Sequence, residues 1–532
     1  MASQYRETPL DTDKMPPGIG YIVGNEAAER FSFYGMRAIL YVFMTEYLLT
    51  ANGEPAFMEE AEARRVGALF RAALYFLPLI GGVLADAVFG KYLTIMSLSV
   101  VYCLGHFVLA LTLNPEISGG IVSPTTGLFT GLFLISLGGG FIKSCVSAHV
   151  GDQFGRNNTH LLPRVFGWFY FSINFGSTAS TLLTPKLLEW YGPDVAFGVP
   201  GIFMLIATIA FWLGRKEYAH VPAKGFGTVR EAFSPVGLKA LANLAMIYAF
   251  VAVFWALFDQ TTDAWVEQAK HMDRVYVANW LPESMTGLAS EVEEGTYLRE
   301  EIEPTDRVVE LSPSQLQAAN PILVMMFIPL FGYAIYPAVN AVWTLTPLRK
   351  MSVGLFLTAA AWAVSVWIQK RIDAGAHPDI FWQIVAYVVL TAAEVMVSIT
   401  GLEFSYTQAP KAMKSIVMGV WLLSVWLGNI FVAAVNYGIE LDWYSLEGEN
   451  YYWFWQWAIL LTAVLFVPAT LLYRGKTYTQ DAPDDGSETG GVDPDGNPAP
   501  VRTRADRGTA QPESAAIDED PDEDPPARRS NA

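Results

Sequence analysis

The stretch EAAERFSFYGMR, residues 26–37, determines how this chain is read. It lies inside an otherwise apolar segment that runs to about Leu49 and is long enough to cross a bilayer. A charged side chain at membrane depth costs roughly 2.5–3.5 kcal/mol on insertion scales, so such residues pair with one another or face a water-filled path. The charged residues of the stretch are Glu26, Glu29, Arg30 and Arg37.

These charges share one side of the predicted helix. At about 100° per residue, Glu26, Arg30 and Arg37 fall within one narrow arc, and Glu29 and Tyr34 flank it. A membrane helix with a single charged stripe points that stripe at a central cavity, and transport is the default function of such a cavity. The alternative is a soluble amphipathic helix with i,i+4 ion pairs, and the rest of the chain argues against it.

The whole chain has the composition of a membrane protein. Of its 532 residues, 52% are hydrophobic and only 16% are charged. With the opening helix, we predict an all-α membrane protein of about twelve spans, each long enough for about 30 Å of hydrocarbon. The further apolar stretches lie near 66–89, 92–113, 126–150, 163–185, 195–213, 238–262, 321–345, 350–370, 380–408, 415–437 and 451–473.

Basic residues in alternate short loops predict the orientation. They follow the even-numbered spans, so these loops and both termini are expected on the cytoplasmic side of a multi-pass plasma (inner) membrane protein. Residues 1–18 lack an apolar signal region, so the first span is expected to serve as the insertion signal. The basic residues are Lys91, Arg156, Arg164, Arg215, Lys216, Lys224, Arg230, Arg349, Lys350, Lys411, Lys414, Arg474 and Lys476.

The predicted spans divide into six and six at a charged, helix-breaking segment. No clear sequence repeat relates the halves, yet this arrangement suggests two pseudo-symmetric bundles around a midplane site. We interpret the long outer connection as a small lid or external elaboration. The acidic tail is expected to be a disordered, solvated extension, with a docking role as the alternative. The expected parts are a cytoplasmic segment 1–18, a first bundle 19–213, a linker 214–237, a second bundle 238–474 with an insertion 264–320, and a tail 475–532.

Two further intramembrane charges suit a zwitterionic ligand. Lys143 lies deep in the fourth span, after three glycines that allow close helix approach. The alternative interpretation is that Lys143 snorkels, with its ammonium group reaching the cytoplasmic surface, although about eight residues separate it from that end of the span. Glu394 lies inside the tenth span, in the other half. If it opposes Lys143, the two would form a charge dipole across the cavity.

A second pairing is predicted near the outer surface. Asp259 lies near the outer end of the seventh span, and Arg37 lies near the outer end of the first. If they pair, the ion pair would join the two halves and act as an outer gate; otherwise Asp259 faces the outside water. Cys103 and Cys145 fall in different spans, so we expect no disulfide, and no spacing indicates a metal site or a cofactor.

The motifs resemble one known family. Residues 26–35 look like the ExxERFxYYG motif of the proton-coupled oligopeptide transporters, a branch of the major facilitator superfamily. The resemblance covers all but the long loop and the tail, and it implies the major facilitator fold. The other matching segments are 82–92, 151–154, 169–177, 254–260, 320–321 and 401–410.

The resemblance also implies roles for individual positions. Glu26, Glu29 and Arg30 would respond to protons, with Lys143 and Glu394 completing the coupling network. Arg37 and Asp259 would form the outer salt bridge. The substrate site would comprise Arg30, Tyr34, Tyr75, Lys143, Asn174, Asn320, Glu394, Ser398 and Trp421.

The chain departs from the family pattern at three places. Phe33 replaces a tyrosine, Ser144 replaces a proline, and the second span has no histidine. Proton handling would then depend on carboxylates. The function implied is proton-coupled import of di- and tripeptides by alternating access, by a monomer in a lipid bilayer and without nucleic acid. The alternatives are a carrier of nitrate, amino acids or glycosides, or a sensor that does not transport. No nucleophile–base set favours an enzyme.

Overall fold

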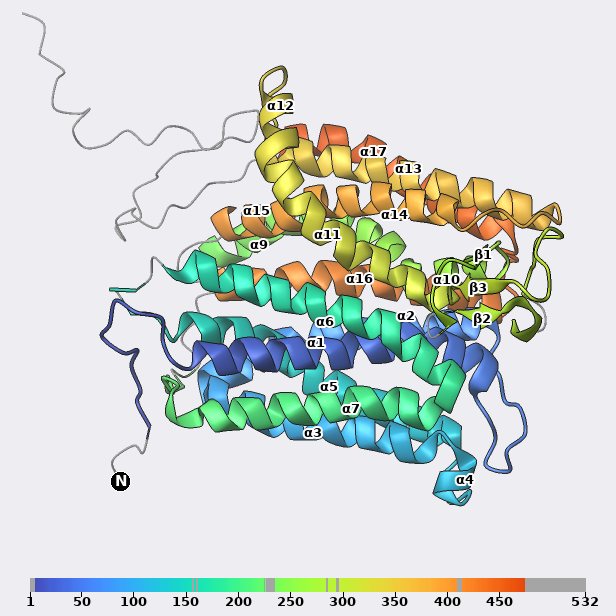
Figure 1. Cartoon of the computed structure of the whole chain (residues 1–532). Helices are drawn as coiled ribbons and strands as arrows, with labels where there is room; N and C mark the ends of the chain where they lie inside the picture. Colours follow the sequence, from blue (N-terminus) through green and yellow to red (C-terminus); the bar gives the residue numbers. More distant parts are fainter. Residues whose placement is uncertain are drawn as a thin grey trace, which may run out of the picture.

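A computed structural model describes residues 5–473, apart from 156, 159–160, 224, 226–234, 284–285, 293–295 and 409–413. The tail, most of the linker and the basic residues Arg156, Lys224, Arg230, Lys411, Arg474 and Lys476 therefore lie outside the described residues. Twelve long helical segments lie side by side (Figure 1).

The first half contains α1 to α7. Two of its helices end in a π-helical segment, at 43–47 after α1 and at 85–89 after α2. A short α4 (Pro115–Ser118) connects α3 to α5. The long helices are α1 (Ile19–Val42), α2 (Glu60–Leu84), α3 (Lys91–Thr112), α5 (Pro124–Gly151), α6 (Leu162–Tyr191) and α7 (Pro193–Leu213).

The second half contains α9 to α17. Two spans in this half are interrupted by π-helical segments: α11 and α12 are joined by 331–335, and α14 and α15 by 395–399. The helices are α9 (Pro235–Phe258), α10 (Ala264–Lys270), α11 (Ala319–Leu330), α12 (Tyr336–Asn340), α13 (Pro347–Asp373), α14 (Phe381–Glu394), α15 (Thr400–Gln408), α16 (Lys414–Glu440) and α17 (Glu449–Leu472).

Most of the described spans meet the length and apolarity expected for crossing a membrane. Ten helical segments satisfy both among the residues that the structure describes. The other two spans are α1, which carries the charged stripe, and α6, which has three serines and three threonines. The twelve-span, all-helical prediction for the membrane part is therefore confirmed.

The two halves share one packing pattern that the sequence did not reveal. In the first half α1 packs on α6, α3 on α5 and α3 on α7; in the second half α9 packs on α16, α13 on α14 and α13 on α17. A Cβ atom at Gly176 would lie 2.5 Å from the carbonyl oxygen of Ala27, and one at Gly428 would lie 2.4 Å from that of Ala252. Each half thus uses a glycine to bring its fifth long helix against its first.

The predicted role of the glycines before Lys143 is confirmed. A Cβ atom at Gly138 would lie 2.7 Å from Cβ of Tyr102 on α3, and one at Gly140 would lie 2.8 Å from Cβ of Leu77 on α2. Real Cβ atoms do not approach so closely, so α5 packs against both helices only because these positions lack a side chain. This packing fixes the helix that carries Lys143.

Each half has its own hydrophobic core. One cluster contains buried side chains from Ile19 to Tyr218, with Val266 added; the other contains side chains from Leu244 to Phe466, with Ala68 added. Between the halves, α2 packs along α16 and α6 packs on α11. In each of these contacts the second long helix of one half, α2 or α11, packs against the fifth long helix of the other, α16 or α6.

The long outer connection starts later than predicted and contains a small sheet. After Asp263, whose φ of −127° and ψ of −79° interrupt the helix, the chain turns helical again in α10, so the insertion proper begins after Lys270. Strands β1 (Val275–Val277), β3 (Arg307–Glu310) and β2 (Gly287–Leu288) form an antiparallel sheet in the order β1-β3-β2. The sheet lies at the end of the bundle opposite the amino terminus, which we call the sheet end (Figure 1).

The connection touches both halves. Tyr276 donates a hydrogen bond of 2.8 Å to Asp379, in the segment between α13 and α14. A 3-10 segment, Pro313–Ala318, then reaches the first half, where Gln315 Nε2 lies 2.8 Å from the carbonyl oxygen of Leu182 and Gln317 Nε2 lies 3.3 Å from that of Ala38. The insertion therefore covers the junction of the halves at the sheet end.

Candidate functional site

A cavity of about 170 Å³ lies between the two halves. Its walls come from α1, α2 and α6 of the first half and from α9, α11 and α14 of the second. A second cavity of about 150 Å³ adjoins it and shares Tyr34, Ser177, Asn320, Pro321 and Glu394. Ligand sites of this kind combine apolar and aromatic walls with a few polar groups, and this pair of cavities has both.

Glu394 is the carboxylate that both cavities share. Its Oε2 accepts a hydrogen bond of 2.6 Å from Asn320 Nδ2, which also lies 3.2 Å from Thr391 Oγ1. The π-helical segment 395–399 begins at the next residue. Such segments often occur at functional sites, because they break the regular helix and re-aim the side chains beside them. The second half therefore presents a hydrogen-bonded carboxyl group to the cavity.

The charged stripe of α1 forms a compact cluster inside the first half. Arg30 Nε lies 2.7 Å from Glu26 Oε1 and 2.8 Å from Glu29 Oε2. All three side chains are less than one-tenth exposed. One guanidinium is thus shared by two carboxylates. A buried anion without a full partner is costly, which makes this cluster a natural place for a proton to bind.

Lys143 lies beside that cluster and behind the cavity wall. Its ammonium nitrogen is 4.0 Å from the centroid of the Tyr75 ring and 5.0 Å from that of Phe33. The guanidinium of Arg30 lies 6.0 Å from the same Phe33 ring. Because Tyr75 lines the cavity, Lys143 is separated from a ligand there by one aromatic ring. Its charge interacts with that of Glu29, and it makes no contact with Glu394 among those found in the described residues.

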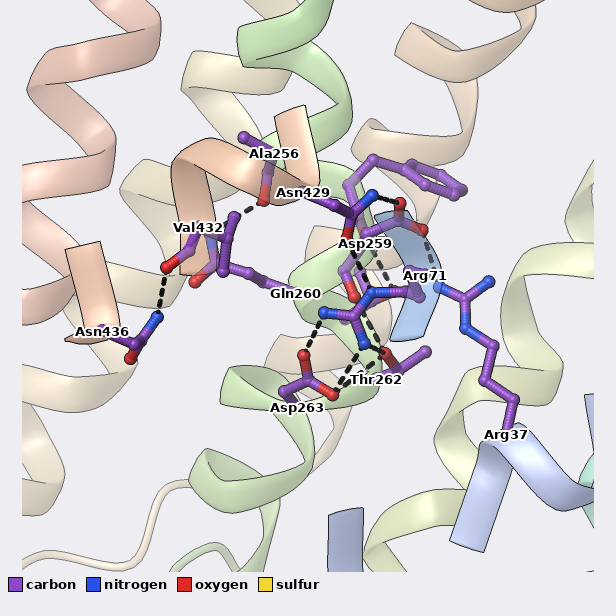
Figure 2. A network of polar contacts seen from close by, with 12 residues as sticks. Arg37, Arg71, Ala256, Asp259, Gln260, Thr262, Asp263, Asn429, Val432 and Asn436 are labelled. Atoms are coloured by element: carbon purple, nitrogen blue, oxygen red, sulfur yellow. Dashed lines mark hydrogen bonds and ion pairs between the residues drawn. The ribbon is translucent and has the colours of Figure 1, made fainter. Parts of the chain in front are cut away.

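A network of polar contacts closes the cavity at the sheet end (Figure 2). Arg37 Nη2 on α1 lies 2.6 Å from Asp259 Oδ1, at the end of α9. Asp259 Oδ2 accepts a hydrogen bond of 2.7 Å from Asn429 on α16. The amide oxygen of Asn429 in turn accepts one of 2.8 Å from Arg71 Nε on α2. Arg71 also forms an ion pair with Asp263.

The structure brings most of the sequence-predicted residues to this region. Tyr34, Tyr75, Arg37 and Asp259 line the larger cavity, and Asn174 lines the smaller one. Asn320 and Glu394 line both. Glu26, Glu29, Arg30 and Lys143 form the layer beside it within the first half.

Two predicted substrate residues lie elsewhere. Trp421 is only 3% exposed and packs edge-on against Tyr248, at a centroid distance of 5.5 Å, inside the core of the second half. Ser398 lies in the π-helical segment 395–399. Neither lines either of the two cavities. The geometry therefore gives no support to a substrate role for these two residues. The helix of Ser398 reaches the cavity one turn earlier, at Glu394, and the aromatic wall is made by rings other than that of Trp421.

Sequence reasoning missed Arg71, Asp263 and Asn429. The signal for Arg71 was available, since it is an arginine inside a predicted apolar span and therefore meets the same energetic criterion as Lys143. Asp263 fell between the predicted span, which ends at 262, and the predicted insertion, which begins at 264, and it was given no role. Asn429 is uncharged and carries no signal of its own in the sequence. Only the fold places these three side chains together.

The described residues contain no group of three or more His, Cys, Asp and Glu side chains that could hold a metal ion. The site instead has a cavity whose second-half wall carries the carboxyl group of Glu394, while Lys143 and Arg30 are buried behind the first-half wall. A helical membrane protein with two matching six-helix halves around such a cavity is a secondary transporter of the major facilitator type.

The sequence pattern of the POT family matches residues 92–233 and 300–453, together more than half of the chain, and the chain belongs to this family. It is 34% identical over 400 residues to Peptide transporter 3 of Caenorhabditis elegans. The aligned region covers 67% of this chain and 51% of that relative. It is 33% identical over 435 residues to Solute carrier family 15 member 2 of Homo sapiens, covering 73% and 54%. The chain thus spans about half the length of the curated relatives it matches.

Among solved structures, the fold is similar to that of the POT family transporter PepTSo. The TM-score is 0.72, with 34% sequence identity, and the match covers 86% of this chain and 99% of that one. The family expected from the motifs, and the transporter class it implies, are therefore confirmed.

Proposed function

We propose that this protein is a proton-coupled symporter that carries di- and tripeptides across the membrane by alternating access. The observation that carries the proposal is the central cavity, whose walls from opposite halves present a carboxyl group on one side and buried cations behind the other. A peptide is a zwitterion with termini a few ångströms apart, and this separation of charge suits it. The relative named Peptide transporter 3 supports the same substrate class.

In this scheme the amino terminus of the peptide binds near Glu394 and Asn320. The carboxylate points toward the side of the cavity where Tyr75 covers Lys143. Tyr34 and Asn174 add polar contacts from the first half. Because the termini carry the recognition and the remaining walls are aromatic, we expect broad tolerance of side chains and modest affinity.

The α1 cluster couples this binding to protons. Arg30 is a single cation that both Glu26 and Glu29 contact. Protonation of one of the two glutamates frees the guanidinium to turn toward the substrate carboxylate, and deprotonation recaptures it. Proton binding and peptide binding thus favour each other through one shared arginine, which is the reciprocal coupling that symport requires.

The sheet end is the outer end in this scheme. Both termini are then cytoplasmic, the insertion faces outward, and the protein acts as a monomer in a plasma (inner) membrane. Arg37 and Asp259 form the outer gate, which is closed in the described conformation. Uptake requires this gate to open, so the ion pair breaks and re-forms once in each cycle.

The test is uptake of labelled dialanine into proteoliposomes, with and without an inward proton gradient. We expect accumulation above equilibrium only with the gradient, its loss when a proton ionophore is added, and competition by unlabelled tripeptide. Free amino acids, nitrate and a glycoside serve as competitors for the other solute classes. Competition by one of these with none by peptide would contradict the proposal, as would accumulation that ignores the ionophore.

A further inference from the structure

A second ion pair joins the two halves beside the outer gate. Arg71, on α2 of the first half, pairs with Asp263, between the 3-10 segment 259–262 and α10 of the second half. The Arg71 side chain is 3% exposed and that of Asp263 is 4% exposed. These values match the burial of Arg37 and Asp259, at 10% and 2%. Both pairs are therefore shielded from water and cross the same interface.

An amide connects the two pairs. Asn429 is fully buried and uses both ends of its side chain: Nδ2 donates to Asp259 Oδ2 at 2.7 Å, and Oδ1 accepts from Arg71 Nε at 2.8 Å. Its orientation is therefore fixed by the arginine of one pair and the aspartate of the other (Figure 2). If Asp259 moves away or binds a proton, the hydrogen bond that orients the amide toward Arg71 weakens as well.

The backbone connects them a second time. Asp259 and Asp263 stand at the two ends of one short 3-10 segment, and both arginines belong to the other half. Arg71 Nη1 also lies 3.1 Å from Thr262 Oγ1 on that segment. When this segment moves away from the first half, both arginines lose their carboxylates together. Two guanidinium groups and two carboxylates then leave a dry interface in one step.

We propose that Arg71 is a gating residue: with Asp263 it forms a second buried lock between the halves, which Asn429 couples to Arg37–Asp259 so that both locks open and close as one unit. The proposal deepens the proposed function, because it rests on alternating access at the same site. A single buried pair would hold the sheet end closed only while that pair is intact. Two coupled locks make the closing step all-or-none, which prevents a half-open state that would leak protons.

The test measures the conformational equilibrium directly. In lipid nanodiscs, distances are recorded by electron paramagnetic resonance between spin labels at two exposed positions, Glu116→Cys on α4 and Ala376→Cys. Helix α4 lies at the sheet end (Figure 1), and Ala376 precedes His377 and Asp379, which contact His271 and Tyr276 there. The two native cysteines, Cys103 and Cys145, are not joined by a disulfide and are replaced by serine and alanine. We expect Arg71→Met to raise the ratio of open to closed populations by about tenfold or more. The matched control is Arg65→Met, which breaks the part-exposed pair Arg65–Glu440 at the same interface and should change this ratio little.

The coupling is tested by a double-mutant cycle. Arg71→Met and Asp259→Asn are measured singly and together; one coupled unit predicts that the double variant shifts the ratio no further than the stronger single variant. In an Asn429→Val background the two effects should become more nearly additive, because only the coupling through the 3-10 segment 259–262 remains. If Arg71→Met does not fold, Asp263→Asn breaks the same pair with smaller change and takes its place in the cycle.

Two results would overturn the proposal. One is a distance distribution in Arg71→Met that equals that of the parent or of Arg65→Met. The other is full additivity of Arg71→Met and Asp259→Asn when Asn429 is present. Because these measurements need neither peptide nor gradient, they are independent of the uptake assay. A parent protein without peptide uptake would contradict the proposed function and leave the lock intact, whereas unchanged distances with normal uptake would reject the lock alone.

Discussion

Two clusters of buried charge lie on either side of the central cavity, and they differ in balance. At the sheet end, Arg37 and Arg71 face Asp259 and Asp263, and Asn429 fills the remaining bonds. In the α1 cluster, Arg30 alone faces both Glu26 and Glu29. In the first cluster each carboxylate has a guanidinium of its own, whereas in the second two carboxylates share one guanidinium and only the nearby charge of Lys143 adds to it.

They also differ in location. The balanced cluster joins the two halves, so its contacts must break whenever the halves separate at this end. The unbalanced cluster lies within the first half and can remain assembled through the whole cycle. A balanced set of charges across an interface suits a conformational lock, and an unbalanced set within one body suits a titrating site. Four predictions test this division.

The largest effect is expected from Glu29→Gln in the unbalanced cluster. The amide keeps the shape of the side chain but cannot exchange a proton, so gradient-driven accumulation of labelled dipeptide should be abolished. Counterflow without a gradient should persist, because the lock is untouched. Both are measured in proteoliposomes. Glu403→Gln, an exposed glutamate of α15, is the control that should retain accumulation. Accumulation at the parental level in Glu29→Gln would remove the titrating role.

A somewhat smaller effect is expected from Asp259→Asn in the balanced cluster. It leaves Arg37 buried without its carboxylate, and breaking a buried pair in this way costs about 3–5 kcal/mol. We expect the sheet end to open in the spin-label distance measurement, and counterflow to slow. This is the reverse of the Glu29→Gln pattern. If both variants lose only gradient-driven uptake, the two clusters do not have separate functions.

A moderate effect on uptake is expected from substituting Phe33, whose ring lies near two cations. Phe33 lies 5.0 Å from the Lys143 ammonium and 6.0 Å from the Arg30 guanidinium. Desolvated cation–π contacts contribute about 2 kcal/mol, so Phe33→Leu should lower gradient-driven uptake by up to about thirtyfold. Phe33→Tyr keeps the ring and is the matched control. Equal uptake by the leucine and tyrosine variants would show that the ring face is not used.

The smallest effect concerns pH at the sheet end. The hydrogen bond that His271 donates to the Glu267 carboxylate, whose Oε1 lies 3.4 Å from His271 Nε2, raises the pKa of His271 above its usual range. A raised histidine pKa gives stability that is fully present below the unfolded value, near 6.5, and is lost as pH rises through the folded value. Because the side chain is 56% exposed, solvent screens the pair and the effect should be below about 0.5 kcal/mol.

The measurement is the difference in thermal midpoint between the parent and His271→Gln at pH 5.5 and pH 8.5. The parent should be slightly more stable than the variant at the lower pH and equal to it at the higher. A difference that grows with rising pH would contradict the assigned sign.

Much of the site followed from one energetic rule. Charges inside apolar stretches identified Glu29, Arg30, Lys143 and Glu394 before any fold was considered, and the structure places all four in or beside the cavity region. The same rule applied to Arg71 would have identified the second lock. The rule says nothing about Trp421, whose substrate role was implied by the family resemblance alone and whose burial in the core is decided by the helices around it.

The sequence by itself determined the number of spans, their grouping into halves and the family, because hydrophobic length and buried charge are properties that local residues carry with them. It suggested two pseudo-symmetric bundles but not the contacts that make them match, since equivalent glycines such as Gly176 and Gly428 are meaningful only when the facing backbone is known. Nor did it determine the lock at the sheet end. Arg71, Asp263 and Asn429 come from three helical regions far apart in the chain, and only tertiary packing sets them within hydrogen-bonding distance.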